Sequence, residues 1–364
     1  MRTSCILYYK EYSCQKSKKI GIKVLKRIEM LQGLLKKENI KKLISAVKKT
    51  GRFFGPVKGS EGMSLSELGP DDEPALDYSN LKLPPKRQLF PWSEVICTYG
   101  AENIAEAPVS GEKVVIFGVR PCDALSLTYL DKIFLDEKFI DPYYRSRKDN
   151  SVIISLACSE PLETCFCTSV GGSPAGREGA DILAFVMKDS LLFEACSEKG
   201  RTFMDHHSAV FQKPGQADIK TRDEQASAAE KKVQMIGVSD ITEKLKGNFD
   251  SPVWDKIAER CISCGVCAYL CPTCHCFGFY DEKAGLKGRR IRVQDSCMFS
   301  SFTIEASGHN PRTTGGERMR QRIMHKFRYT VENSGDIFCV GCGRCIGNCP
   351  VNIDIRESVA EVVK

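Results

Sequence analysis

Two runs of cysteines near the C-terminus have the spacing that most clearly indicates a chemistry. Each run has the form C-x2-C-x2-C-x3-C-P. The first comprises Cys261, Cys264, Cys267, Cys271 and Pro272, and the second comprises Cys339, Cys342, Cys345, Cys349 and Pro350. Thiolates at this spacing hold iron–sulfur clusters, with three ligands from one run and the fourth from the other. The two runs therefore predict two [4Fe–4S] clusters.

The fourth thiolate of each cluster is expected to cross over between the runs. The first predicted ligand set is Cys261, Cys264, Cys267 and Cys349, and the second is Cys271, Cys339, Cys342 and Cys345. This exchange would pack the two runs together and hold both clusters close enough for electron transfer. Zinc is the alternative, but zinc ribbons use two separated C-x2-C pairs, which this spacing does not match.

An α/β domain is expected between residues 76 and 215. The predicted elements are a strand over 113–119, a helix over 124–134, a strand over 152–157 and a hairpin of 181–187 with 191–196. Short apolar runs bounded by turn residues are typical of buried parallel strands. The strand–helix–strand order predicts a short parallel βαβ unit with a right-handed crossover.

Four more cysteines would gather at one edge of this predicted sheet. Cys122 and Cys158 follow the two parallel strands, and Cys165 and Cys167 lie in the next loop. The carboxyl ends of parallel strands share an edge, where such folds bind ligands, so the four thiols form a candidate third cluster site. Free cysteine also packs as a small buried hydrophobe, and C-x-C is not a standard cubane spacing. The sequence leaves both interpretations open.

Three further cysteines lie between the two runs. The segments HCFGFYDE and GRRIRVQDSC are expected to be the arms of a hairpin that turns near 284–285. This hairpin would bring Cys276 and Cys297 together at its base, close to Cys271. With Cys274, they could be alternative ligands, thiols beside a cluster or ordinary packing, and packing is the interpretation we favour.

Charged and aromatic groups near the runs could tune the clusters. Arg344 lies inside the second run and could offset cluster charge, while His275, His309 and His325 could donate hydrogen bonds, although surface or core histidines are commoner. The stretch MRQRIMHKFR at 319–328 is a predicted basic helix, which either docks an acidic partner or presents a solvated face.

The chain divides by composition into five segments. Residues 1–29 are lysine-rich, contain Cys5 and Cys14, and are expected to be an extension from a misplaced start. The second segment, 30–75, is expected to contain a helix over 35–49, a strand over 52–57 and the start of a loop over 59–90. The remaining three segments are the α/β domain over 76–215, a helical linker over 216–250, and a mainly helical two-cluster ferredoxin-like domain over 251–364. The predicted fold class is therefore α/β or α+β.

Composition and charge indicate which cellular compartment and which kinds of partner to expect. The 364 residues include 19 cysteines, which are clustered rather than spread as in a disulfide framework, so a reducing cytoplasm and an anaerobic host are expected. No apolar run reaches the length of a membrane span. The formal charge is +7, and two clusters of about −2 each would lower it to roughly +3. Because no basic block is long, a nucleic-acid partner is not expected.

The chain resembles the beta subunits of sulfhydrogenases and the related A subunit of anaerobic sulfite reductase. The resembling segments are GVRPCDALSL at 118–127, DPYYRSR at 141–147, CFC at 165–167, CISCGVCAYLCPTCHCF at 261–277, QDSCMFSSFTIEASGHNPR at 294–312 and CVGCGRCIGNCP at 339–350. The resemblance implies an electron-carrying subunit of a hetero-oligomer. In such complexes a flavin subunit exchanges electrons with NAD(P)H, and a hydrogenase, sulfite reductase or heterodisulfide-reductase-type subunit is catalytic.

We therefore predict an electron-transfer subunit with two [4Fe–4S] clusters and a candidate third, and no catalytic residues of its own. No G-x-G-x-x-G flavin fingerprint is evident, so electrons should enter from another chain. One alternative is a redox enzyme with a substrate at the α/β edge, where Arg120 would bind an anion and Asp123 would transfer protons, although a helix-capping role for Asp123 is favoured. A zinc-binding nucleic-acid module is the other alternative.

Overall fold

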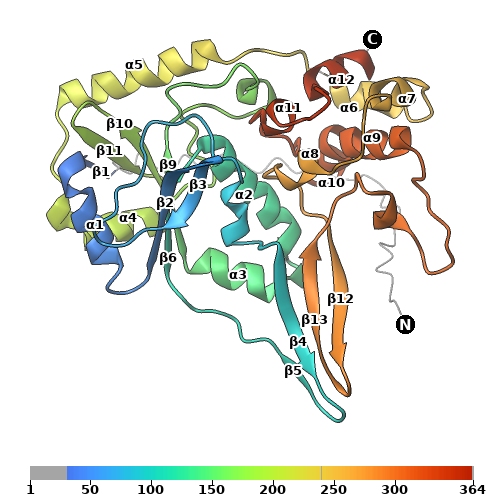
Figure 1. Ribbon diagram of the computed structural model, residues 1–364. Coiled ribbons are helices and arrows are strands. Elements are labelled where there is room, and N and C mark those ends of the chain that lie inside the picture. The colour runs from blue at the N-terminus through green and yellow to red at the C-terminus, as the bar shows by residue number, and fades with distance from the viewer. Residues whose placement is uncertain (1–30, 239, 363–364) are drawn as a thin grey trace.

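The computed structural model describes residues 31–238 and 240–362. The predicted N-terminal extension, with Cys5 and Cys14, lies outside these residues. An α/β body built on a twisted sheet lies beside a helical cysteine-rich body, and a long β-arm extends from the junction between them (Figure 1). The predicted mixed α/β fold class is confirmed.

The main sheet has the order β1-β11-β10-β9-β6-β2-β3. Its strands are β1 Gln32–Lys36, β2 Arg52–Gly59, β3 Gly62–Glu67, β6 Val114–Val119, β9 Ser151–Leu156, β10 Ile182–Val186 and β11 Ser190–Ala195. The central strands β2, β6, β9 and β10 are parallel, and the outer pairs are antiparallel. The predicted βαβ unit and the β10–β11 hairpin are confirmed.

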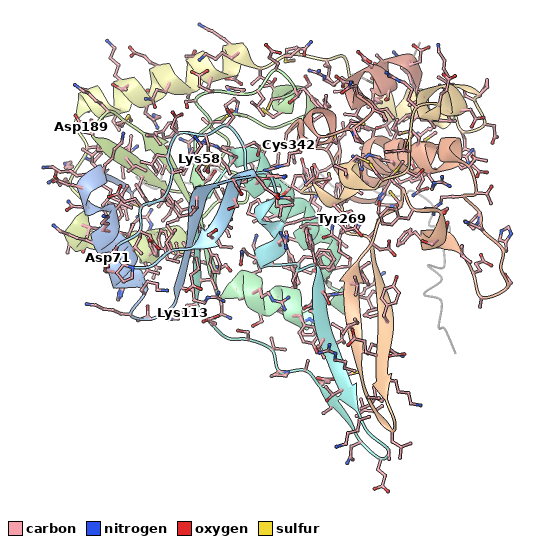
Figure 2. All side chains as sticks on the ribbon, viewed as in Figure 1. Lys58, Asp71, Lys113, Asp189, Tyr269 and Cys342 are labelled. Carbon is pink, nitrogen blue, oxygen red and sulfur yellow. The ribbon has the colours of Figure 1, made fainter. Side chains whose placement is uncertain are left out.

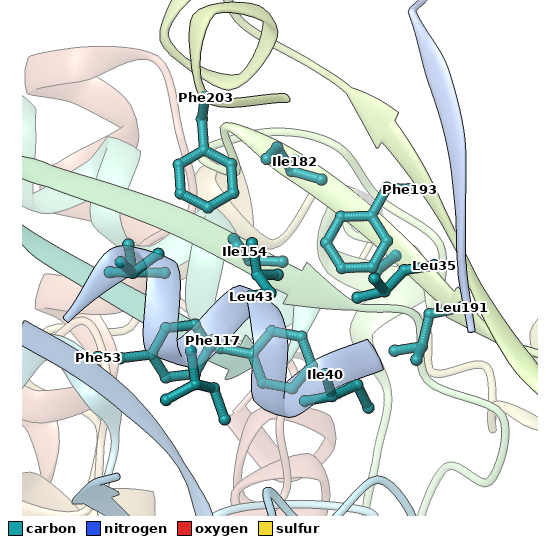
Figure 3. Close-up of a cluster of buried hydrophobic side chains, with 14 of the residues drawn as sticks. Leu35, Ile40, Leu43, Phe53, Phe117, Ile154, Ile182, Leu191, Phe193 and Phe203 are labelled. Atoms are coloured by element: carbon teal, nitrogen blue, oxygen red, sulfur yellow. The ribbon is translucent and has the colours of Figure 1, made fainter. Parts of the chain in front are cut away.

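Helices cover both faces of this sheet. On one face, α1 Ile40–Val47 and α4 Glu198–His206 pack on apolar side chains such as Phe53, Phe117 and Ile154 (Figure 3). The predicted helical stripe of α1 is confirmed, because its apolar residues at spacings of three and four are all buried. On the other face lie α2 Pro121–Phe134 and α3 Pro142–Asp149.

Two expectations for the N-terminal part are wrong. Residues 62–67 were expected in a loop, but they form β3, which pairs with β2. A tight turn at Gly62, where φ is +111°, aligns this serine-rich segment on β2 despite its loop-like composition. The predicted helix over 35–49 starts only at Ile40, because residues 32–36 instead pair with β11 as β1.

The cysteine-rich body is built from short helices. They are α6 Ile241–Lys246, α7 Val253–Ala258, α8 Val266–Tyr269, α9 Gly315–Met324, α10 Thr330–Ser334, α11 Arg344–Gly347 and α12 Ile355–Val362, with a π-helical turn at His325–Tyr329. Trp254, Ile323 and Phe327 are central to their shared core. The longer helix α5 Gln216–Lys232 runs from the sheet toward this body (Figure 1). No helix in the described ranges is long and apolar enough to cross a bilayer.

The β-arm contains the predicted hairpin. It comprises β12 Phe277–Ala284, β13 Lys287–Gln294, β4 Ser93–Tyr99 and β5 Ile104–Glu106, and a small separate pair is formed by β7 Leu135–Asp136 and β8 Phe139–Ile140. Glu94 anchors the base of the arm, because its carboxylate accepts hydrogen bonds from Arg292 on β13 at 2.9 Å and from Arg147 on α3 at 2.7 Å.

The core beneath α1 makes a stability prediction. Leu43 is 1% exposed within this core, so Leu43→Ala should lower the free energy of unfolding by about 2–5 kcal/mol through lost burial and a cavity. Lys42→Ala, at an exposed position of the same helix, should change it by less than about 0.5 kcal/mol. Urea unfolding followed by far-ultraviolet circular dichroism measures both, and equal midpoints would contradict this account of the core.

Candidate metal centres

The first predicted ligand set surrounds one cavity in the cysteine-rich body. Cys261, Cys264, Cys267 and Cys349 line this cavity, and Cys345 lines it as well. The backbone follows a tight path here, since φ is +55° at Ser263 and +74° at Gly265 just before α8. Cys264 is exposed, so this cavity reaches the molecular surface.

The second predicted set surrounds a deeper cavity. Cys271, Cys339, Cys342 and Cys345 line this space of about 320 Å³. Both cavities take cysteines from both runs, as the crossed pairing requires. The first cavity is lined by three cysteines of the first run and by Cys345 and Cys349 of the second, and the second cavity by Cys271 of the first run and three cysteines of the second.

The candidate third set also comes together, at the carboxyl edge of the main sheet. Cys122, Cys158, Cys165 and Cys167 line a cavity of about 350 Å³. Cys122 lies in the first turn of α2, directly after β6, and Cys158 follows β9. The parallel topology thus places side chains from distant segments around one space.

The second run is pressed against the loop that carries Cys165 and Cys167. The Phe166 amide donates to the Gly341 carbonyl at 2.8 Å. Gly341 has φ of +59°, and a Cβ there would lie 2.5 Å from the Cys167 amide nitrogen, so only glycine permits this approach. Cys342 lies at the junction of α2 with the cysteine-rich body (Figure 2).

The three cavities lie in series. Cys345 lines the first and the second, and Cys342 lines the second and the third. The described cysteines all carry free thiols. Among residues 31–238 and 240–362, no three histidine, cysteine or acidic side chains are placed to hold a single metal ion; the predicted ligands surround open spaces instead.

For part of the basic helix at 319–328 the expectation of a solvated face is wrong, and docking of an acidic partner stays a prediction. Arg318, Arg322 and Lys326 lie four residues apart, on one helix face, and that face is buried. Arg322 donates to the Cys267 carbonyl at 2.8 Å and contacts Cys274 Sγ at 3.6 Å. Lys326 Nζ lies 3.1 Å from Cys271 Sγ. The buried face of this helix therefore points toward the cysteines. The same helix carries Met319 and Ile323, which pack in the core of the cysteine-rich body.

These buried cations test whether iron–sulfur clusters fit the cavities. Arg322 and Lys326 are 4% and 5% exposed, and within the described residues neither pairs with a carboxylate. A buried unpaired charge is very costly, and arginine does not lose its proton. Burial raises the pKa of Cys339 to about 11 and that of Cys345 further. Of the second ligand set, only Cys271 has a lowered pKa, so one thiolate would face two cations, whereas a cluster held by four thiolates would balance both.

Cys271 differs from the other thiols of the second set. A hydrogen bond from the Cys274 thiol, and then the charges of Lys326 and Arg322, lower the pKa of Cys271 well below its ordinary value, although burial opposes them. A thiolate is the form that binds metal. Cys271, the predicted crossing ligand of the second set, is therefore the thiol of that set closest to the metal-binding form.

The third cavity has its own charged surroundings. Burial is the main cause that raises the pKa of Cys165 to about 11 and of Cys167 to about 12. Arg120, 2% exposed, lies beside Cys158 and donates to the Ala157 carbonyl at 3.0 Å. Its guanidinium also stacks on the Tyr78 ring, 3.8 Å from the centroid. Arg120 therefore supplies positive charge at this edge while being held by the fold.

Asp123 and Arg344 form a pair that the sequence did not suggest. The two guanidinium nitrogens of Arg344 donate to the two carboxylate oxygens of Asp123 at 2.6 and 2.7 Å, and both residues are buried. The favoured helix-cap role of Asp123 is therefore wrong, because its oxygens bind Arg344 rather than backbone amides of α2. This bidentate pair fixes the second run to α2.

Other predicted residues have mixed outcomes. The predicted meeting of Cys276 and Cys297 is confirmed, because their side chains hydrogen-bond to each other. His275 and His325 stand together with ring centroids 5.4 Å apart, whereas His309 is exposed. Sequence reasoning missed Lys86, which is fully buried and donates to the Cys271 carbonyl at 2.8 Å. Lys86 is far from both cysteine runs in the sequence and has no cysteine beside it, so no local pattern indicated this contact.

Comparisons with known proteins agree with this geometry. Residues 260–353 match a family model described as a 4Fe-4S dicluster domain. The chain is 33% identical over 333 residues to sulfhydrogenase 2 subunit beta of Pyrococcus furiosus, covering 90% of this chain and 97% of that protein. It is 25% identical over 170 residues to the F420-dependent formate dehydrogenase subunit beta of Methanocaldococcus jannaschii, covering 44% of this chain and 36% of that protein.

The buried ammonium of Lys326 makes a testable prediction. Lys326→Met should lower the reduction potential of the cluster in the second cavity by tens of millivolts, because lost positive charge disfavours the added electron. A redox titration followed by electron paramagnetic resonance (EPR) measures the shift. Lys244→Met, at an exposed position of α6, is the control and should leave every potential unchanged. An unchanged potential in Lys326→Met would contradict the role assigned to this cation.

Proposed function

This chain belongs to the family of sulfhydrogenase beta subunits, and we propose that it relays electrons through three [4Fe–4S] clusters in a row. It is an iron–sulfur electron-transfer subunit of a multi-subunit oxidoreductase. The observation that carries the proposal is the series of three cavities, each lined by four or five cysteines and joined through Cys345 and Cys342.

The cavity linings support specific ligand sets. In this proposal the first cluster binds Cys261, Cys264, Cys267 and Cys349, the second binds Cys271, Cys339, Cys342 and Cys345, and the third binds Cys122, Cys158, Cys165 and Cys167. Each cluster, when bound, accepts and passes on one electron. The protein shields the second site from solvent, since Cys271, Cys339 and Cys342 are all buried.

The two ends of the row are the proposed points of electron entry and exit. The first site opens to the surface at the exposed Cys264. The third lies at the sheet edge, where Cys158 and Cys165 are half-buried. The second site lies between them, and three of its four cysteines are buried. A partner docked near either end would therefore exchange electrons with the row.

The proposed partners follow from the family. Sulfhydrogenase and formate dehydrogenase are the redox enzymes named in the two relatives. We assign a flavin-containing NAD(P)H-oxidoreductase subunit to one end of the row and a catalytic redox subunit, of the hydrogenase type, to the other. An anaerobic cytoplasm is the proposed setting. A substrate site on this chain is not favoured, because Asp123 and Arg120 are both held by internal contacts.

The crossed ligand sets predict which cluster each substitution removes. Cys349→Ala should remove about four iron atoms and abolish the EPR signal of the cluster in the first cavity, leaving the second, because Cys349 belongs to the second run but lines the first cavity. Cys196→Ala, outside all three cavities, is the control and should retain all the iron. If Cys349→Ala instead lost the cluster next to Lys326, the crossed assignment would be wrong.

The relay role predicts how the isolated chain behaves. Loaded with clusters but without partners, it should not reduce a viologen dye with NADH or NADPH, because electrons must enter through a flavin subunit. Adding a flavin-containing NAD(P)H-oxidoreductase subunit should start dye reduction. Anaerobic spectrophotometry follows both reactions. Dye reduction by the isolated chain with NADH would instead show that it has its own nicotinamide site.

A further inference from the structure

A cavity beside the second set is lined by thiols that the proposed relay does not use. Cys274, Cys276 and Cys297 line it, together with His275 and His325. None of these three cysteines belongs to the ligand sets assigned above. Cys276 is half-buried, whereas Cys297 is buried, so Cys276 is the more accessible thiol of the two.

The β12–β13 hairpin brings Cys276 and Cys297 together. Phe277 on β12 lies opposite Gln294 on β13, and just beyond this pair the Asp295 amide donates to the Cys276 carbonyl at 2.8 Å. The two cysteines therefore meet at the base of the hairpin, where their side chains hydrogen-bond to each other. Two thiols in side-chain contact are placed to form a disulfide.

The two thiols differ in the way that thiol–disulfide exchange requires. The hydrogen bond with Cys297 is the main cause that lowers the pKa of Cys276, and the same contact raises the pKa of Cys297 well above its ordinary value. The thiolate is the nucleophilic form of cysteine. Cys276, which is also the more exposed, is therefore suited to attack a substrate, and Cys297 to resolve the product of that attack.

This pair lies beside the proposed relay. The thiol of Cys274, which lines the same cavity, hydrogen-bonds to Cys271 of the second ligand set. Cys297 belongs to the same core as Cys267 of the first set. The first and second clusters of the proposed relay would therefore adjoin the pair, so one-electron carriers would stand next to a possible two-electron centre.

Ordinary packing accounts less well for this arrangement. Cysteines that only fill space behave as small hydrophobes, but the walls of this cavity include two imidazoles and the charged side chains of Arg322 and Lys326. Positive charge favours thiolates, both on the protein and on a departing substrate. In a reducing cytoplasm, which is the proposed setting, cysteine pairs that form disulfides are usually catalytic or redox-sensing.

We propose that Cys276 and Cys297 form a redox-active dithiol that reduces a small organic disulfide with electrons from the relay. The site lies in the cysteine-rich body, apart from the α/β edge at which a substrate site is not favoured. The inference rests on the proposed function for its supply of electrons, whereas the exchange with the substrate needs only the two cysteines.

The proposed reaction has three steps. The Cys276 thiolate attacks one sulfur of the substrate, and the other sulfur leaves and takes up a proton. Cys297 then loses its proton and attacks Cys276 Sγ, which forms the disulfide between them and releases the second substrate thiol with that proton. Two electrons from the relay, passed one at a time, and one proton restore the Cys276 thiolate and the Cys297 thiol. In sum, one disulfide, two electrons and two protons give two thiols.

Peptide mapping tests the dithiol without an activity measurement. Trypsin releases Cys276 within 261–283 and Cys297 within 293–312, where Cys297 is the only cysteine. The cluster-loaded chain, treated without oxygen with 2-hydroxyethyl disulfide and then alkylated, should yield these two peptides joined through Cys276, with its iron content unchanged. Mass spectrometry detects the link. Absence of this link, or a link from Cys297 to Cys274 instead, would overturn the proposal.

Single substitutions test the roles of the two thiols. Cys297→Ser should trap half of the probe as a mixed disulfide on Cys276, because no resolving thiol remains. The double variant Cys97→Ser, Cys196→Ser, at two cysteines outside the four cavities, is the control and should form the link as the unsubstituted chain does. In Cys276→Ser, a probe adduct on Cys297 would overturn the assigned roles. The link in the unsubstituted chain does not depend on the folding of any variant.

Electron delivery tests the connection with the relay. With electrochemically reduced methyl viologen as donor, the cluster-loaded chain should reduce 2-hydroxyethyl disulfide, and Cys276→Ser should lose this activity while it keeps the cluster EPR signals. Equal activity in Cys276→Ser and the unsubstituted chain would overturn the proposal. If the relay assignment failed, the EPR signals would be missing although the peptide link still formed. If the signals were present without the link, the dithiol alone would be overturned.

Discussion

Buried positive charge is the constraint on which this structure depends. Arg322 and Lys326 come from one face of a helix and are enclosed among cysteines without a carboxylate partner in the described part of the chain. Such charges are tolerable only beside compensating anions. The thiols of the second set provide only part of this charge, since the pKa of Cys271 is lowered but burial raises the pKa of Cys339 and Cys345. The cysteine-rich body is therefore arranged around inorganic clusters, and its folding should be coupled to their assembly, as in other metal-bound domains.

Two sets of contacts join the α/β body of the chain to the cysteine-rich body. The second run is fixed to α2 by the buried pair of Arg344 with Asp123 and to the Cys165–Cys167 loop by the contact of Phe166 with Gly341. These contacts bring the carboxyl edge of the sheet against the ferredoxin-like part, so the third cavity shares Cys342 with the second. In the proposed relay, this α/β edge, of a kind that commonly binds a soluble ligand, is one end of the electron path.

Local patterns in the sequence predicted much of this arrangement, and contacts between distant segments explain the rest. The spacing of the two runs, the βαβ unit and the β12–β13 hairpin could be predicted because each is encoded within a short stretch. Strand β1 was missed because its partner is β11, more than a hundred residues away. The pairing of Asp123 with Arg344 and the approach of Lys86 to Cys271 likewise join distant segments. The inward face of the basic helix had a local signal, the four-residue spacing of Arg318, Arg322 and Lys326, but solvent was the simpler expectation.

The most direct measurement is anomalous diffraction at the iron absorption edge, from crystals of the chain grown without oxygen. The account predicts separate iron centres in the first, second and third cavities, arranged in series and bound by cysteines from both runs and from the sheet edge. Zinc in these cavities, disulfides between the cysteines that line them, or cavities without iron would contradict it.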